Sequence, residues 1–261
     1  MVPRVFYRKA PLFQVTCQIK FPAILKIQSE PPAAFQDKIR DVFPLFEAVT
    51  TQILPQIPQA GSNIVFGSSV STGYNFNTED NNTTLSLSSD SISLTTKKYK
   101  EWGIFLEQLM GPIAAFVEIY NPSFYTRIGL RYQDFIIRED LGFDEPPPWS
   151  SLLRKEVLGE LYIKDFEDNM IDCRRVLFVK MPSIDATLLL QHGMAKFPDN
   201  PTVGYLFDFD FSTSNKTGVA DAGCVLAGLH NGSGRAFRWC ITDTLHSALD
   251  PIALDEAVVG S

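Results

Sequence analysis

The sequence has few of the residues from which metal and catalytic sites are built. It contains only 4 cysteines and 3 histidines in 261 residues. The cysteines are Cys17, Cys173, Cys224 and Cys240. No two of them form a Cys-x-x-Cys pair, so the spacing excludes the common zinc and thioredoxin patterns and predicts reduced, partly buried thiols. His230 and His246 are too far apart on one expected helix to share a metal, and we expect surface or helix-capping roles for both and for His192.

Catalytic and phosphate-binding motifs are also absent. The chain has no Gly-x-Ser-x-Gly nucleophile elbow. The glycine-rich segment 229–235 lacks the Gly-Lys-Ser/Thr ending of a phosphate loop, and no strand immediately precedes it. We expect it to form a bend or loop within a helical hairpin. The sequence therefore predicts no cofactor and no metal, and it favours a protein that is not an enzyme.

Clustered positive charge and long apolar runs are missing as well. The 23 Lys and Arg are outnumbered by 30 Asp and Glu, which gives a formal charge of -7. Because phosphate neutralisation needs clustered cations, general binding to nucleic acid is not expected. No apolar run approaches the ~20 residues of a membrane span, and segment 1–9 lacks the apolar core of a signal peptide. We therefore expect a cytoplasmic protein with no membrane partner.

Two segments place charged residues on one face and apolar residues on the other. In 205–211, aromatic rings alternate with Asp208 and Asp210, and in 126–132 apolar residues alternate with Arg127 and Arg131. Side chains of a strand point alternately to opposite faces, so each segment predicts a strand with one apolar and one charged face. We expect the basic strand and the acidic strand to share one sheet.

The charged faces allow several interpretations. Asp208 and Asp210 lie about 7 Å apart on one strand face, which suits a divalent cation or acid/base chemistry, but no third ligand is evident. An exposed polar face is the simpler alternative. If Arg127 and Arg131 lie opposite, a buried charge lattice with a structural role is the better hypothesis.

The remaining pattern alternates strands with helices. Strands are expected at 13–21, across 64–99 as an antiparallel meander with a hairpin at 85–94, and at 174–181, 186–195 and 202–212. Helices are expected from Pro31 to Pro44, over 101–120 with a kink at Gly111-Pro112, over 149–161, and from 221 to 249 with an interruption at 232–234. Residues 45–62 give a mixed signal, because Pro55 and Pro58 break any long element.

This order predicts an α+β fold with two similar halves, each an antiparallel sheet backed by helices. The N-terminal half covers 1–138 and the C-terminal half covers 149–261. An acidic, Pro-rich junction at 139–148 separates them. We interpret the halves as a diverged internal duplication whose sheets form either a continuous central sheet or a barrel-like interior.

Three parts of the chain resemble a sporadically distributed family of prokaryotic proteins of roughly 250 residues with no assigned activity. The similar parts are Pro11-Leu12-Phe13-Gln14-Val15 with Phe21-Pro22, the segment 124–132, and the tail from Leu229-His230 through 237–246. The resemblance spans nearly the whole chain and implies a single functional unit. The patchy distribution of the family implies mobile or defence-linked genes.

The leading functional hypothesis is a non-enzymatic binding or accessory module that recognises a protein partner or assembles with itself, as a homodimer. Arg235, Arg238 and Trp239 lie together on the last helix and have the composition of a protein-contact hot spot. Arginine stems packed along the domain surface are an equal alternative.

Two further hypotheses come from other classes. One is an enzyme or binding protein for an anionic, phosphorylated small molecule held between the sheets, since arginine pairs bind phosphate through two hydrogen bonds. Its residues would be Arg127, Arg131, Asp208 and Asp210. The other is an acidic, nucleic-acid-associated defence component, which rests on the resemblance.

Overall fold

The computed structural model describes residues 5–53, 69–170, 172–197 and 200–252. Over this part of the chain the fold is α+β, with a nine-stranded antiparallel sheet backed by helices. The hydrogen-bonded strand order is β3-β4-β5-β6-β2-β7-β10-β9-β8. The end strands β3 and β8 are not neighbours in this order, so the described strands do not close into a barrel.

The chain divides into two compact units, each of which is assembled from separate stretches of sequence. One unit consists of 16–128 with 214–222, and the other of 1–15 with 129–213 and 223–261. We call them the β3–β6 unit and the β8–β10 unit. The duplication of an α+β half remains a prediction.

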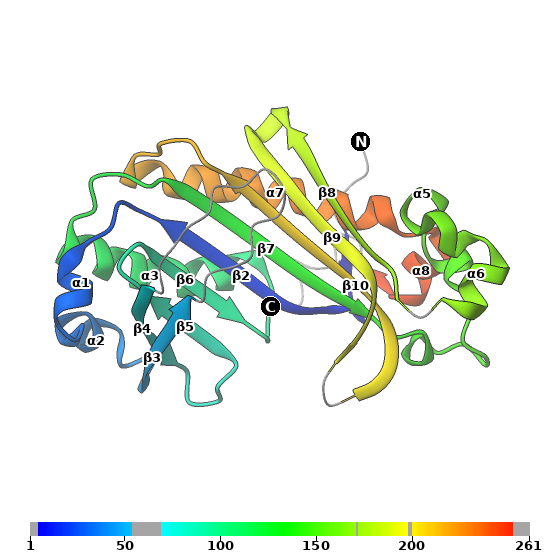
Figure 1. Cartoon of the computed structure of the whole chain (residues 1–261), viewed down its shortest axis with the longest axis horizontal. Helices are drawn as coiled ribbons and strands as arrows, with labels where there is room; N and C mark the ends of the chain where they lie inside the picture. Colours follow the sequence, from blue (N-terminus) through cyan, green and yellow to red (C-terminus); the bar gives the residue numbers. More distant parts are fainter. Residues whose placement is uncertain (1–4, 54–68, 171, 198–199, 253–261) are drawn as a thin grey trace. The chain divides into compact units, whose positions relative to one another are not determined.

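The β3–β6 unit is a run of antiparallel strands with helices packed on one face (Figure 1). Its elements are β2 (Leu12–Lys20, which begins in the other unit), α1 (Leu25–Ser29), α2 (Ala33–Ile39), β3 (Leu45–Ile53), β4 (Ser69–Asn77), β5 (Thr83–Leu87), β6 (Ser91–Thr96) and α3 (Trp102–Tyr120). The predicted hairpin at 85–94 is confirmed, since Leu85 pairs with Leu94 and Leu87 with Ile92, all of them buried.

Helix α3 is the one described helix that is long and apolar enough to cross a membrane by length and composition. It contains Pro112, and it packs against the sheet through six buried residues. These are Phe105, Leu109, Pro112, Ile113, Ala115 and Phe116. The rings of Phe21 and Phe116 lie 4.6 Å apart between their centroids. This contact is typical of a core helix in a globular unit, so α3 is weak evidence for a membrane span.

The β8–β10 unit places one long helix on the aromatic face of its strands. Its strands are β1 (Phe6–Tyr7), β7 (Arg127–Ile136, which begins in the other unit), β8 (Arg174–Met181), β9 (Ala186–Phe197), β10 (Asn200–Thr213) and β11 (Pro251–Ile252). Its helices and 3-10 turns are η1 (Arg138–Leu141), α4 (Trp149–Leu152), α5 (Lys155–Leu158), η2 (Gly159–Tyr162), α6 (Lys164–Asn169), η3 (Pro182–Ile184), η4 (Val219–Asp221, in the other unit), α7 (Ala222–Cys240) and α8 (Asp243–Ala248).

The four aromatic side chains of β10 form the core ridge of this unit. Tyr205, Phe207, Phe209 and Phe211 are all at most 2% exposed. Helix α7 covers them, and the centroid of the Phe207 ring lies 6.2 Å from that of Phe237 (Figure 1). The predicted apolar face of this strand is therefore confirmed, because the period-two alternation sends every second ring to the same side.

One expected element was wrong, and one segment that the sequence left open forms a strand. Segment 45–53 has a mixed signal yet forms β3, because nine residues pair in register with β4 and tertiary pairing overrides weak local preference. Pro55 and Pro58 lie outside the described residues. The single helix expected over 149–161 is instead a series of short turns, interrupted where Leu153 is extended and bridges Ile241, and where Gly159 has a φ of +52°.

The interruption expected at 232–234 in the last helix was also wrong. Helix α7 continues through this segment, and the break falls at Ile241-Thr242. A Cβ atom on Gly232 would lie 2.9 Å from Cδ1 of Ile184 and 3.9 Å from the ring of Phe211. The glycine is therefore explained by its close approach to Ile184 of η3 and not by a turn.

Candidate functional site

Arg131 and Asp208 form an ion pair across neighbouring strands. Nε of Arg131 donates to Oδ1 of Asp208 at 2.6 Å, and Nη2 donates to Oδ2. The side chain of Arg131 is 41% exposed, whereas that of Asp208 is 7% exposed. The hydrogen bond with Asp208, opposed by burial and aided by the charges of Asp208 and Asp210, raises the pKa of Arg131. The prediction that the basic and acidic strands share one sheet is confirmed.

Two glutamines extend this pair into a polar row on the face opposite the aromatic ridge. Nε2 of Gln133 donates to Oδ2 of Asp208 at 3.5 Å, and Nε2 of Gln14 donates to Oε1 of Gln133 at 2.9 Å. The buried carboxylate thus accepts hydrogen bonds from two side chains of β7. Buried polar groups need such partners, so the row works as a structural lattice.

The other two residues predicted for this site have different surroundings. Nη1 of Arg127 donates to Oε1 of Gln18 at 3.2 Å, and both belong to the β3–β6 unit. Asp210 lies on β10 and acts on Arg131 through its charge. The structure therefore brings Arg131, Asp208 and Asp210 together and shows Arg127 with a partner of its own. Their role in ligand binding remains a prediction.

The three residues predicted for partner contact lie at the end of α7 and differ in exposure. Arg238 donates to Asp243, and its Nη1 donates to the carbonyl oxygen of Ile241 at 3.3 Å. Its side chain is only 15% exposed, so it holds the junction between α7 and α8 together. Arg235 is exposed, and Trp239 is 49% exposed. Trp239 is therefore the most accessible apolar group of this set.

Two histidines predicted at the surface are buried, so that expectation was wrong for them. Nδ1 of His230 lies 2.7 Å from the hydroxyl of Tyr132, and Nδ1 of His192 lies 2.8 Å from the hydroxyl of Tyr205, each in a hydrogen bond. Burial lowers the pKa of His192 to about 4, with a smaller contribution from Arg175. A tyrosine hydroxyl thus offsets the cost of burying each ring. His246, which is partly exposed, contacts Tyr7 in the same way.

Asp134 is a buried carboxyl group beneath the end of α7. It lies on the helix-facing side of β7 and is 6% exposed. Its negative charge acts on Cys240 and on Tyr7. Burial raises the pKa of Asp134 to about 7. The group is therefore largely protonated in mildly acidic solution and must become charged inside the unit as the pH rises.

Replacing Asp134 by Asn should make the stability of the protein less sensitive to a rise in pH from about 4 to about 7. Since the folded pKa lies above the unfolded one, Asp134 lowers stability progressively between about pH 4 and about pH 7. His192 acts in the opposite direction below pH 6.5, but it is present in both proteins and cancels in the comparison. We expect the melting temperature of D134N minus that of the wild type to increase from pH 5 to pH 8. A difference that is constant with pH would contradict this account.

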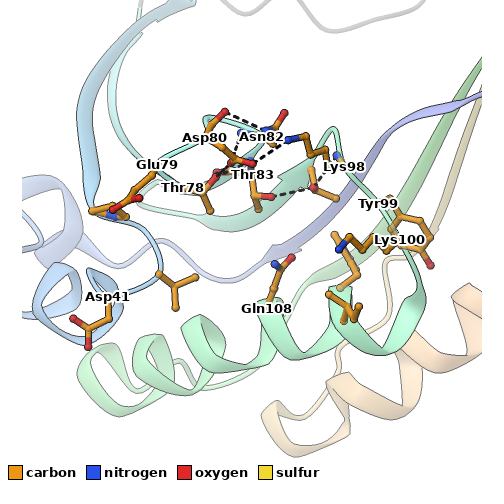
Figure 2. Close-up of a pocket in the computed structure, with 15 residues that line it drawn as sticks. Asp41, Thr78, Glu79, Asp80, Asn82, Thr83, Lys98, Tyr99, Lys100 and Gln108 are labelled. Atoms are coloured by element: carbon orange, nitrogen blue, oxygen red, sulfur yellow. Dashed lines mark hydrogen bonds and ion pairs between the residues drawn. The ribbon is translucent and has the colours of Figure 1, made fainter. Parts of the chain in front are cut away.

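The β3–β6 unit contains an open pocket of about 750 Å³ (Figure 2). The β4–β5 turn forms its polar side, where Asp80 accepts hydrogen bonds from Thr78 and Asn82 and lies 3.3 Å from Nζ of Lys98. The hydrogen bond from Thr78, followed by those from Asn82, lowers the pKa of Asp80. Lys98 is thus already paired with an acid at this rim. The arrangement stabilises the turn, and it identifies no ligand.

The sequence analysis missed an exposed apolar strand. Four consecutive side chains of β8 are exposed, and Phe178 at 75% is more accessible than any other large hydrophobic residue in the described part of the chain. The four are Val176, Leu177, Phe178 and Val179. On the same unit, α6 and the residues just before it expose Tyr162, Ile163 and Phe166. Both surfaces belong to the β8–β10 unit.

The composition of β8 gives no signal of its exposure. An apolar run without alternation predicts a strand buried on both faces. Here β8 is the last strand in the order, so one side lacks a neighbouring strand among the described residues. An exposed apolar run of this kind at a sheet edge is therefore a candidate contact surface.

Comparisons with known proteins assign no family: no protein-family model matches the chain, and no curated protein matches it.

Proposed function

We propose that the protein is a non-enzymatic binding module that associates with a protein partner or with a second copy of itself through β8. The observation that carries this proposal is the exposure of Val176, Leu177, Phe178 and Val179 on an edge strand. Natural proteins usually protect sheet edges with charges, proline, bulges or short strands, because an open apolar edge aggregates. The central four residues of β8 have none of these devices.

The alternative, an anionic ligand held by the charged strands, has less support. Arg131 already donates two hydrogen bonds to Asp208, and Arg127 donates to Gln18. An incoming phosphate would have to compete with a buried carboxylate for Arg131. Binding to an unpaired arginine would face no such competition.

The setting of this function follows from the resemblance and the composition. We propose a cytoplasmic protein that acts in a defence-linked system. General binding to nucleic acid is not part of the proposal, because the formal charge is -7.

Replacing Phe178 by Glu should abolish association. The substitution places a charge at the most exposed apolar position of the strand, where a partner would have to desolvate it. The matched control is Leu25→Glu, because Leu25 is 73% exposed on the other unit. Both variants should keep the melting temperature of the wild type.

Native mass spectrometry of protein purified gently from its own host measures the association. We expect a dimer or a stoichiometric complex for the wild type and for L25E, and a bare monomer for F178E. A complex that survives in F178E would place the contact elsewhere. A bare monomer in all three preparations would contradict the proposed function itself.

A further inference from the structure

The backbone of β8 presents hydrogen-bonding groups outward at alternate residues. β8 and β9 pair antiparallel with Arg174 opposite Gly193, and the N–H of Met194 donates to the carbonyl of Cys173 at 3.0 Å. In an antiparallel pair the hydrogen-bonded positions alternate with positions whose groups point away. Counting along β8 from Cys173, the backbone N–H and C=O groups bond to β9 at positions 175, 177 and 179. The backbone groups at positions 174, 176, 178 and 180 point away from β9.

The outward positions coincide with the exposed apolar side chains. Val176 and Phe178 present both an outward amide and an exposed side chain, at 58% and 75% exposure. No strand lies beyond β8 among the described residues (Figure 1). An extended segment placed there would gain main-chain hydrogen bonds and apolar contacts together, as in recognition by strand addition.

Positive charge borders this apolar centre on both sides. Arg174 and Arg175 precede it and Lys180 follows it, while β8 itself contains no acidic residue. Arg175 is held by Glu160. Arg174 forms an ion pair with Asp172 at 3.4 Å, which is weak because Arg174 is 82% exposed, and Lys180 is exposed. A complementary strand would have an apolar centre and acidic ends.

A second copy of β8 matches these charges less well than an acidic strand would. In an antiparallel pair of two copies, residues with outward groups must face each other. One such register sets Arg174 directly opposite Lys180 twice, and another sets Lys180 opposite Val176 with three cations still on each strand. A third sets Asp172 opposite Lys180 but leaves Arg174 opposite Phe178. Like charges across strands destabilise a sheet. A strand with acidic ends can face Arg174 and Lys180 together, so charge complementarity favours a different partner.

We propose that β8 is extended by a strand of a partner protein whose apolar centre is flanked by Asp or Glu. This inference rests on the proposed function and specifies its partner class and its binding mode. The strand adds next to β8, and its amides and carbonyls pair with those of Val176, Phe178 and Lys180. Its acidic ends lie near Arg174 and Lys180.

The probe is a synthetic strand of about ten residues with Glu pairs at both ends and alternating Val and Tyr between them. Two matched probes replace the Glu pairs by Lys pairs, or the central residue by Pro. Hydrogen exchange of the full chain, resolved to single amides, is measured with and without each probe. We expect the Glu-ended probe alone to slow exchange at positions 176, 178 and 180. Positions 175, 177 and 179 should change little, since their amides already bond to β9.

One pair of variants and one double variant separate the contributions of backbone and charge. V176P removes one outward amide but no bond to β9, and V176A removes a comparable part of the side chain while keeping the amide. The Glu-ended probe should bind V176A and fail to bind V176P. The double variant R174E/K180E should weaken the Glu-ended probe about tenfold and bind the Lys-ended probe instead.

The possible outcomes each decide one question. Equal binding of the Glu-ended and Lys-ended probes would overturn the acidic partner, and exchange that slows equally at odd and even positions would overturn strand addition. Slower exchange with rising protein concentration alone would identify a second copy as the occupant. A host complex that is lost in F178E but kept in V176P would leave the proposed function intact while contradicting strand addition.

Discussion

Replacing Phe207 by Ala is expected to destabilise the β8–β10 unit by about 3–5 kcal/mol, the usual cost of removing a fully buried aromatic ring. Phe207 is completely buried between the neighbouring rings of Tyr205 and Phe209, with centroids 5.1 Å and 5.6 Å away. It also stacks on His192 and meets Phe237 of α7 edge-on. The substitution would therefore open a cavity where β10, β9 and α7 meet.

Urea unfolding of F207A and of the wild type measures this loss. The control is F143A, because Phe143 is 41% exposed in the same unit and its removal should cost less than about 1 kcal/mol. Hydrogen exchange should show the loss at amides of β10 and α7 first. If F207A and F143A had similar stability, the aromatic ridge would not be the core of this unit.

The faces of the central strands were predictable because they depend on a local rule. The alternation in 205–211 and in 126–132 determines which side chains share a face, whatever sheet the strand belongs to. The bounds of β8 were predicted in full, as 174–181. The neighbour of each strand is a non-local property, however, and a run such as that of β8 has the composition of a buried strand. Its exposure follows only from its place at the end of the strand order.

The histidines show a second limit on what can be predicted from the sequence. His192 follows Leu188 and Leu190 at period two on β9, so its burial could have been predicted from the pattern. The tyrosine hydroxyl that makes burial tolerable comes from β10, thirteen residues further along the chain. For His230 the partner is Tyr132 on β7, far away in sequence. A polar residue on an apolar face cannot be assigned to core or surface until its hydrogen-bond partner is known.

Replacing Arg131 by Ala is expected to cost about 3 kcal/mol, the lower end of the cost of leaving a buried charge without its partner. The carboxylate of Asp208 is 7% exposed and would keep only the 3.5 Å hydrogen bond from Gln133. The reverse substitution, Asp208→Asn, should cost less, about 1 kcal/mol, because the guanidinium of Arg131 is 41% exposed and water can solvate it. The two single substitutions should therefore lower the stability by unequal amounts.

A double-mutant cycle distinguishes this structural role from ligand binding. If the pair stabilises the fold, D208N should recover much of the stability lost in R131A, since the double variant leaves no buried charge unpaired. Thermal and urea unfolding of the four proteins measure the coupling. If R131A instead keeps the stability of the wild type, the arginine is available for an anion, and titration with inorganic phosphate would then decide between the two roles. A ligand role predicts a rise in melting temperature with phosphate that R131A lacks.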